Sequence, residues 1–423
     1  MTSRWGRRDF LKRASFAAGG VMIVPRRVLG GPLYTAPSDE LTRGVIGVGG
    51  MGRGHMTYDG ARLLAVCDVD ADHLDQALEE AGPGVDGYAD YRELLARPDI
   101  DIVHIVTPPH WHGRMAVDAA NAGKDIWCEK PMTRTIGEGE RVLDAVRRNG
   151  TIFRLNTWFR FRDPFYGLGS EVAPLKKLVA AGAFGWPLRA RIGAVTGFDW
   201  KLDQWVGRTD LRPQPVPATL DYDRWLGPAP YKPYHPHRVH QSFRGYWDYD
   251  AGGLGDMGQH YLDPVQYLLG KDDTSPVQIE IDAPQQHPDA VGTWREIRMR
   301  YADGCEIVLD GASREGDEIF IEGPEGWVRK DMRSNVGDLR AIAATLPEPP
   351  TRVTDFAEAV RTRQRFALDA EIGHRSCTLV NLGAIALRLR RRLHFDPESG
   401  RFPGDDEANR LLDPPARSSW GLA

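Results

Sequence analysis

The sequence predicts an α/β protein with a parallel sheet in its first half and an α+β arrangement with an antiparallel sheet in its second half. Between residues 44 and 160, short apolar runs alternate with amphipathic helical stretches, which is typical of a parallel sheet covered on both faces. Beyond residue 250, runs with period-2 alternation are separated by Gly and Asp turns, which indicates antiparallel strands. The glycine-rich turn at residues 47–52 separates the first apolar run from the first helical stretch.

The elements follow in a regular order. In the first half we expect strands at residues 45–49, 62–70, 99–109, 124–131 and 150–157, separated by helices at 71–82, 91–96, 112–123 and 136–150. Residues 196–249 are rich in Pro, aromatic residues and His and form a long connection. Further strands are expected at 277–284, 293–304, 305–312 and 318–332, and helix returns over residues 353–392.

Composition excludes several classes of protein. The chain has 423 residues, 41% hydrophobic and 27% charged, which is enough for two domains with ordinary cores. Its net charge of −5 gives no general attraction for nucleic acid, and we expect no such partner. The four cysteines are far apart and form no CxxC pair, so buried free thiols are favoured over disulfides. No apolar run is long enough for an ordinary membrane span.

The first 40 residues form a segment outside the fold. Arg7 and Arg8, followed by Phe10, Leu11 and Lys12, resemble a twin-arginine export motif. The apolar stretch that follows, residues 14–25, is too short to span a membrane comfortably. We therefore expect export to the periplasm or cell envelope, with no membrane span beyond a signal anchor, and the sequence leaves the cleavage site open.

The turn GVGGMG fits the GxGxxG pattern of a Rossmann dinucleotide site. The first glycine allows a tight turn, the second lets the backbone approach a pyrophosphate, and the third lets helix and strand pack closely. The cofactor contacts expected here are Gly47, Gly49, Gly50, Met51 and Gly52. Asp68 ends the second strand 21 residues after Gly47. A carboxylate there accepts bonds from the ribose hydroxyls and repels a 2′-phosphate, which favours NAD over NADP.

Two later strand ends lie at the same carboxyl edge of the expected sheet. Thr107, Pro108 and His112 follow the third strand, where they would face the cofactor. His112 could instead be a polar residue at a helix start. Glu129 and Lys130 end the fourth strand. A lysine there would bind a substrate hydroxyl and stabilise a developing alkoxide, with Glu129 holding it, although a lysine at a strand end is also a common surface charge.

The segment YDAGGLGDMGQHYLD carries the expected proton-transfer group. Asp256 and His260 are spaced i,i+4, and Asp263 follows three residues later, so a helix presents all three on one face. Histidine is suited to accept a proton near neutral pH, and a neighbouring carboxylate can orient it. The alternatives are a capped surface helix or a metal pair. Since a metal needs a third ligand and the only other histidine cluster is at residues 235–240, we expect no metal site.

Together these motifs, in this order, resemble the Gfo/Idh/MocA family over nearly the whole chain after residue 40. The resemblance implies a Rossmann NAD-binding domain at 41–160 and, at 161–423, a substrate-binding and oligomerisation domain with an open, mostly antiparallel sheet. It implies that Lys130, Asp256 and His260 are catalytic and that the partner is a second copy, as a dimer or tetramer. The segment LNTWFRFRDP is similar to the family's Asn-x-Arg-Phe-x-Pro, with two residues inserted. Asn156 would then contact the cofactor and Arg160 the substrate.

The substrate implied by the resemblance is a sugar or polyol. The long connection carries several aromatic residues that could stack on sugar rings or form a core of their own: Trp200, Trp205, Tyr222, Trp225, Tyr231, Tyr234, Trp247 and Tyr249. Among them, Trp247 and Tyr249 are the candidate substrate contacts. Because export would leave the protein where free NAD is scarce, we expect a tightly bound NAD that is recycled in place. The alternatives are an NAD-dependent glycoside hydrolase or lyase and a non-catalytic sugar-binding protein.

Overall fold

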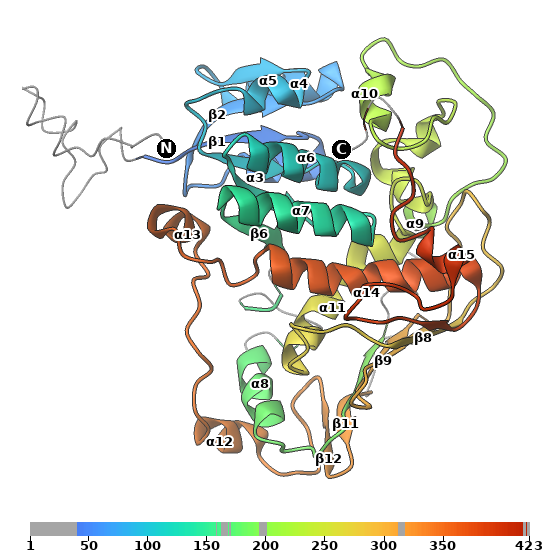
Figure 1. The fold of residues 1–423 in the computed structure, drawn as a ribbon. Helices are drawn as coiled ribbons and strands as arrows, with labels where there is room; N and C mark the ends of the chain where they lie inside the picture. Colours follow the sequence, from blue (N-terminus) through green and yellow to red (C-terminus); the bar gives the residue numbers. More distant parts are fainter. Residues whose placement is uncertain are drawn as a thin grey trace, which may run out of the picture. The chain divides into compact units, whose positions relative to one another are not determined.

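The computed structural model describes residues 40–157, 159–161, 168, 171–193, 201–311, 318–417 and 420 (Figure 1). The expected export segment and Trp200 lie outside these residues. Residues 42–423 form one compact unit. Among the residues described, no helix is long and apolar enough to cross a membrane.

The first half of this unit is a six-stranded parallel sheet. Its spatial order is β3 (Asp86–Tyr88), β2 (Arg62–Cys67), β1 (Thr42–Ile46), β4 (Ile102–Ile105), β5 (Asp125–Glu129) and β6 (Phe153–Asn156). Every neighbouring pair is parallel, so the expected Rossmann sheet is confirmed. Strand β3 was not expected from the sequence, because three largely exposed residues carry no apolar pattern.

Helices connect these strands as the alternation predicts. They are α3 (Gly50–His55), α4 (Ala71–Ala81), α5 (Tyr91–Leu95), α6 (Pro109–Asn121) and α7 (Ile136–Asn149). Helix α7 begins with a capping box between Thr135 and Glu138 and ends at Gly150, which has the left-handed conformation typical of a helix terminus. Because each connection is a parallel crossover, the carboxyl ends of β1, β2, β4 and β5 lie at one edge of the sheet.

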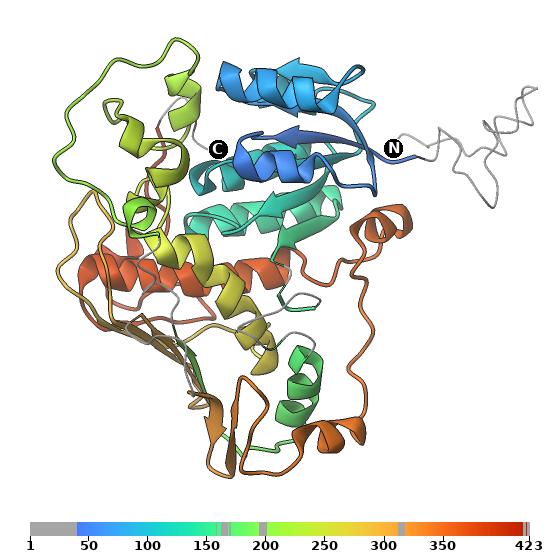
Figure 2. The same ribbon diagram turned by 180° about the vertical axis from the view of Figure 1, so that it is seen from behind.

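The second half contains a seven-stranded mixed sheet. Its order is β12 (Gly326–Arg329), β11 (Ile319–Gly323), β7 (Arg189–Gly193), β10 (Glu306–Asp310), β9 (Glu296–Arg300), β8 (Gln278–Asp282) and β13 (Leu393–His394). Only β7 and β10 pair in parallel, and the other neighbours are antiparallel, as expected. Three helices lie on one side of this sheet: α8 (Val172–Ala180), α11 (Gly252–Leu268) and α14 (Ala370–Leu389) (Figures 1 and 2).

Helix α11 is held between the two sheets by its packing on α14. Gly258 faces Val380, and Gly383 faces Leu254, so both helices use a glycine to bring their axes close. The polar Gln259 also crosses this contact, since it accepts from the Met132 amide and donates to the Gly373 carbonyl at 2.9 Å each. These contacts fix the rotation of α11 and therefore the direction of its functional face.

The remaining short helices surround this frame. They are α9 (Leu202–Trp205), α10 (Tyr222–Leu226), η2 (Pro236–Arg238), η3 (His240–Gly245), α12 (Leu339–Ala344), α13 (Phe356–Thr362) and α15 (Asp406–Asn409). The helix expected over residues 353–392 is therefore two helices, α13 and α14.

The aromatic residues of the long connection are mostly interior. Trp205, Tyr222, Trp225, Tyr234, Trp247 and Tyr249 are all less than 9% exposed, and only Tyr231 is well exposed. The sugar-facing alternative is therefore wrong for Tyr222, Trp225, Tyr234 and Tyr249. Several of them instead form an apolar cluster of their own with Leu226 and Phe243, which stabilises a segment that has little regular secondary structure.

Candidate active site

The centre of the site is an ion pair between Lys130 and Asp256. Lys130 follows the carboxyl end of β5, and Asp256 lies in the second turn of α11. The Lys130 Nζ lies 3.0 Å from the Asp256 Oδ1 and also donates to the Asp256 backbone carbonyl. Their side chains are 11% and 5% exposed, so the pair is poorly screened by water. The structure thus brings together two residues that were assigned to one catalytic centre on sequence grounds.

Three further donors converge on the same carboxylate, and none of them belongs to a motif recognised in the sequence. Lys201 Nζ lies 3.1 Å from Oδ2, Arg244 Nε lies 3.0 Å from Oδ1, and Trp205 Nε1 donates to Oδ2 at 2.8 Å. Although burial by itself raises the pKa of Asp256, the neighbouring Lys130, Arg244 and Lys201 hold that pKa well below its usual range. The site therefore keeps a permanent carboxylate within an excess of positive charge.

His260 lies one turn further along α11 and is 5% exposed. Its ring centroid is 5.0 Å from that of Phe159. Burial, followed by the nearby charge of Lys130, lowers the pKa of His260 to about 3. The imidazole is therefore neutral at physiological pH and has a ring nitrogen able to accept a proton.

The last residue of the predicted triplet, Asp263, belongs to a different group. Arg160 donates to both of its carboxylate oxygens, at 2.8 and 2.7 Å, and also binds Asp272 at 2.6 and 2.9 Å. The Arg160 and Asp263 side chains are 0% exposed. The prediction that Arg160 contacts substrate is wrong, because its buried guanidinium is enclosed by the carboxylates of Asp263 and Asp272. The motif with its two inserted residues did not indicate where this side chain lies.

The other two predicted substrate contacts are also interior. Trp247 donates its ring nitrogen to the His287 carbonyl at 3.1 Å and is 4% exposed. The Tyr249 ring is fully buried, with its centroid about 5 Å from those of His110 and Trp225. The prediction is wrong for Tyr249, whose ring is enclosed by other side chains. Trp247 lines a small cavity together with Arg134 and Arg388, and its contact with substrate stays a prediction.

The glycine turn has the shape that a dinucleotide needs. Gly47 has φ +85°, and a Cβ on it would lie 2.7 Å from the Val106 carbonyl oxygen. A Cβ on Gly52 would overlap the carbonyl oxygen of Gly47. Around Gly50, in contrast, no atom lies within 4 Å of such a Cβ, and Met51 is 56% exposed. The first and third glycines are thus required by packing, and the turn leaves open space for a phosphate group beside the N-terminus of α3.

Asp68 braces this turn. Its Oδ2 accepts the Val48 amide at 2.8 Å and its Oδ1 accepts the Asp70 amide at 3.0 Å. Each carboxylate oxygen has a second lone pair, so these bonds leave capacity for ribose hydroxyls. The position and chemistry of Asp68 therefore fit the predicted role.

After the end of β4, Thr107 is half-buried and Pro108 occupies the N-cap position of helix α6. His112 is 1% exposed, and its Nε2 and Nδ1 lie 2.7 Å from the carbonyl oxygens of Thr107 and Pro131. The ring therefore ties the end of β4 to the end of β5. Burial lowers the pKa of His112, so the ring is neutral and its single N–H donates to one of these two carbonyls. The ring is enclosed near the start of α6, and the cofactor contact predicted for His112 stays a prediction.

Glu129 is held by a buried network that the sequence did not reveal. Its Oε1 accepts from His55 Nε2 at 2.9 Å and from the Asn156 amide. Although burial raises the pKa of Glu129, the hydrogen bond and charge of His55, then Lys130 and Asn156, lower it to about 2. His55 is the last residue of α3, so the network fixes that helix to β5 and β6. Glu129 and Asn156 therefore support the cofactor edge, with His55 as the principal partner of Glu129.

A Rossmann sheet with this glycine turn and a Lys–Asp–His group beside it is the arrangement typical of dinucleotide-binding oxidoreductase folds. Residues 41–157 match the NAD-binding Rossmann fold of the Gfo/Idh/MocA oxidoreductase family, and residues 168–422 match the family's C-terminal alpha/beta domain. The chain belongs to this family.

The relatives of this chain are named for different activities. A glycosyl hydrolase family 109 protein of Shewanella pealeana is 33% identical over 229 residues, 48% of this chain and 49% of that protein. An inositol 2-dehydrogenase of Salmonella typhimurium is 29% identical over 200 residues, 45% and 56% of the two chains. A levoglucosan dehydrogenase of Pseudarthrobacter phenanthrenivorans is 28% identical over 303 residues, 69% and 62%. The chain thus spans about half the length of the first two relatives.

Solved structures agree on the fold. The WlbA dehydrogenase from Bordetella pertussis, in complex with NADH and UDP-GlcNAcA, has a TM-score of 0.58 at 18% identity, over 84% of this chain and 99% of that one. A levoglucosan dehydrogenase in complex with NADH and levoglucosan has a TM-score of 0.54 at 20% identity, over the same two shares. At these identities the likeness concerns the fold.

Proposed function

We propose that this protein oxidises a hydroxyl-bearing carbon of a sugar or polyol by hydride transfer to NAD. The observation that carries the proposal is the ion pair of Lys130 with Asp256, next to a neutral His260, at the carboxyl edge of a sheet with a dinucleotide turn. Inositol and levoglucosan dehydrogenases among the relatives support a carbohydrate substrate.

The residues divide the work between orientation and proton transfer. Lys130 donates to the substrate hydroxyl and stabilises the negative charge that develops on its oxygen. His260, which is neutral, accepts the hydroxyl proton. Asp256 fixes Lys130 and balances part of the charge of Lys201 and Arg244. NAD, when bound, supplies the acceptor for the hydride that leaves the same carbon. The glycine turn and Asp68 would hold it, and the Asp68 carboxylate favours NAD over NADP.

We further propose export by the twin-arginine route and retention of NAD. That route carries folded proteins, so the cofactor can be loaded before transport. Residence for hours requires a dissociation rate constant of ~10⁻⁴ s⁻¹, which with an association rate constant of ~10⁶ M⁻¹s⁻¹ corresponds to a Kd of ~10⁻¹⁰ M. A retained cofactor has to be restored in place, so the reaction returns the hydride to a second sugar or to a later form of the first. The working oligomer is proposed to be a dimer or tetramer of this chain.

A second candidate function is glycoside cleavage by oxidation, elimination or hydrolysis, and re-reduction. Similarity to glycosyl hydrolase family 109 proteins favours it. In this reaction the same groups remove the first proton, and a C–O bond to the aglycone breaks before the hydride is returned. The net reaction is then redox-neutral.

Three measurements test the proposal. Purified, dialysed protein is denatured and the supernatant assayed for nucleotide, and we expect close to one NAD per chain. An empty supernatant contradicts retention, while leaving oxidation with added NAD to be measured separately. Chromogenic glycosides without added NAD distinguish the candidates, since only a hydrolase or lyase releases the aglycone. No turnover with any sugar, polyol or glycoside, with or without NAD, supports a non-catalytic sugar-binding protein and overturns both candidates.

A further inference from the structure

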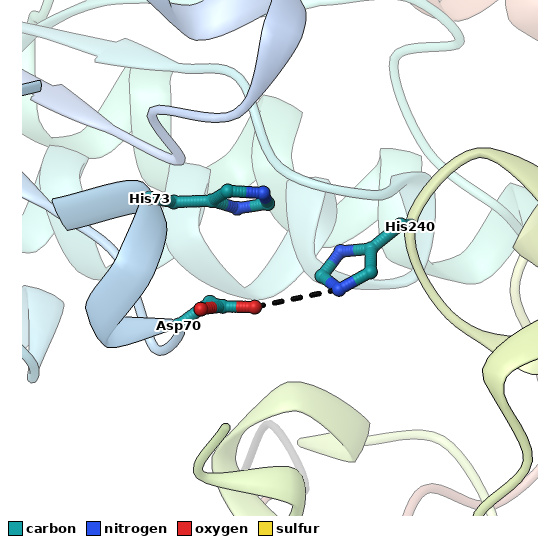
Figure 3. Close-up of side chains that lie close together, drawn as sticks. All are labelled: Asp70, His73 and His240. Atoms are coloured by element: carbon teal, nitrogen blue, oxygen red, sulfur yellow. Dashed lines mark ion pairs between the residues drawn. The ribbon is translucent and has the colours of Figure 1, made fainter. Parts of the chain in front are cut away.

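Three side chains that play no part in the proposed reaction converge beside the start of helix α4. Asp70 and His73 belong to the start of this helix, and His240 begins η3 in the long connection (Figure 3). One ligand atom from each, a carboxylate oxygen and two imidazole nitrogens, all lie within 4.8 Å of one another. The sequence separates His240 from the other two by more than 160 residues, which is why no spacing pattern revealed the group.

We propose that Asp70, His73 and His240 form a binding site for a divalent transition-metal ion of the zinc type. Two imidazoles and one carboxylate are a common ligand set for Zn²⁺, with bonds of about 2.0–2.2 Å. Ligand atoms on a tetrahedron of that size lie roughly 3.3 Å apart. Asp70 Oδ2 and His240 Nε2 are 3.4 Å apart, which fits two ligands of one ion and is long for a direct charged hydrogen bond.

The local structure holds the ligands in place. Asp70 is the N-cap of α4, where its Oδ1 accepts the Asp72 amide at 3.0 Å, and this bond leaves Oδ2 directed at His240. The long connection is pinned at the same point, because the Ala71 amide donates to the Thr219 carbonyl at 2.8 Å and the Asp221 amide donates to the Val69 carbonyl at 2.9 Å. Such outer contacts orient metal ligands in known sites.

His240 itself has an unusual backbone. Its φ of +53° is in the left-handed region, which a residue other than glycine seldom adopts. This conformation presents the ring to Asp70 and His73, with the two imidazole centroids 4.9 Å apart. The His73 and His240 side chains are 32% and 44% exposed, so an ion can enter from solvent. Asp68 Oδ2 lies 3.8 Å from His73 Nδ1.

An ion here would join the Rossmann half of the molecule to the long connection. It would do so beside Asp68, the residue proposed to hold the cofactor ribose. The site is distinct from the Lys130–Asp256 centre and takes no part in hydride or proton transfer.

The test is zinc binding by the full-length, tag-free protein. Equilibrium dialysis is expected to give one tightly bound Zn²⁺ per chain, and Co²⁺ in its place is expected to show visible absorption typical of a low-coordinate site. His240→Asn removes the ligand while keeping a residue that tolerates the left-handed conformation, and we expect at least a tenfold loss of zinc affinity. His73→Ala should have the same effect. His394→Ala, an exposed histidine on β13, is the matched control and should bind as wild type does.

Two results would overturn the site. One is zinc binding that is absent, or equal in His240→Asn and His394→Ala. The other is a change in retained NAD in His240→Asn with no change in zinc binding, because the two histidines would then serve the nucleotide. Circular dichroism of each variant establishes that it is folded, so a loss of zinc affinity can be assigned to the missing histidine side chain.

Discussion

Lys130 and Asp256, 126 positions apart in the chain, form an ion pair of 3.0 Å between the end of a Rossmann strand and the second turn of helix α11. The pair connects the cofactor-binding half of the molecule to the helix that carries His260. Its position makes Asp256 the residue on which the charge balance of the site depends.

Replacing Asp256 by Asn should strongly reduce activity. The amide keeps the size of the side chain but leaves Lys130, Lys201 and Arg244 without their shared carboxylate. We expect kcat to fall about 10²–10³-fold, as for loss of a preorganised electrostatic group. Asp203→Asn, on the exposed face of α9 nearby, is the control and should keep wild-type turnover. Steady-state kinetics of both proteins check this, and equal kcat values would remove Asp256 from the mechanism.

His260→Gln should remove the proton acceptor. General-base catalysis contributes about 10²–10⁴-fold, so kcat is expected to fall within that range. Since burial and Lys130 lower the pKa of His260 to about 3, the imidazole stays neutral through the neutral range. The wild-type pH–rate profile should therefore show no acid limb from His260 between about pH 5 and pH 8. An acid limb near neutral pH that vanishes in His260→Gln would show that the histidine titrates there.

Gly52→Ala should damage the dinucleotide turn. The added Cβ would overlap the carbonyl oxygen of Gly47, so the turn has to move. We expect a lower unfolding temperature and loss of retained NAD. Gly54→Ala lies in the same helix with open space around its Cβ, and alanine is the better helix former, so it should be neutral or slightly stabilising. Thermal unfolding and nucleotide content are measured for both variants, and equal values for Gly52→Ala and Gly54→Ala would contradict the prediction.

Arg160→Met should destabilise the fold. The substitution leaves the fully buried Asp263 without its charge partner, and breaking a buried pair in this way costs about 3–5 kcal/mol. The partly exposed pair of Arg298 with Glu296, at 2.9 Å, gives a control, since Arg298→Met should cost at most about 1 kcal/mol. Denaturant unfolding measures both free energies. Similar small losses would mean that Arg160 is not a structural residue.

Asp250 should make stability depend on pH. Burial, followed by the charge of Asp256, raises the pKa of Asp250 to about 7. An unfolded aspartate titrates near ~3.9, so between about pH 4 and pH 7 the folded state holds a proton that the unfolded state lacks. Its contribution therefore declines as the pH rises through this window, by at most about 1.4 kcal/mol per pH unit.

Asp250→Asn removes this titration and keeps an oxygen that can accept the Ala251 amide. Relative to wild type, the variant should gain stability as the pH rises from about 5 to about 8. Unfolding free energies of the two proteins across that range provide the measurement. A difference that does not change with pH would show that Asp250 keeps an ordinary pKa in the folded protein.

Much of the first half of the fold could be predicted because its signals are local. The period of the apolar runs distinguishes strand from helix, and the glycine turn sets the start of α3. The i,i+4 spacing of Asp256 and His260 needed only a helix to be meaningful, and α11 provides it. Strand β3 could not be predicted, because a three-residue, largely exposed segment shows no alternation of apolar and polar residues.

By itself, the sequence determined the alternation of most strands and helices in the first half, the family, the dinucleotide turn and the Lys130–Asp256–His260 group, since each rests on neighbours in the chain or on a motif. Tertiary structure alone decided which charges share a carboxylate. It placed Lys201 and Arg244 on Asp256, enclosed Arg160 between Asp263 and Asp272, and brought His240 to Asp70. The physical reason is that burial and pairing depend on how distant segments pack, and a side chain's type and position in the chain do not specify its partner.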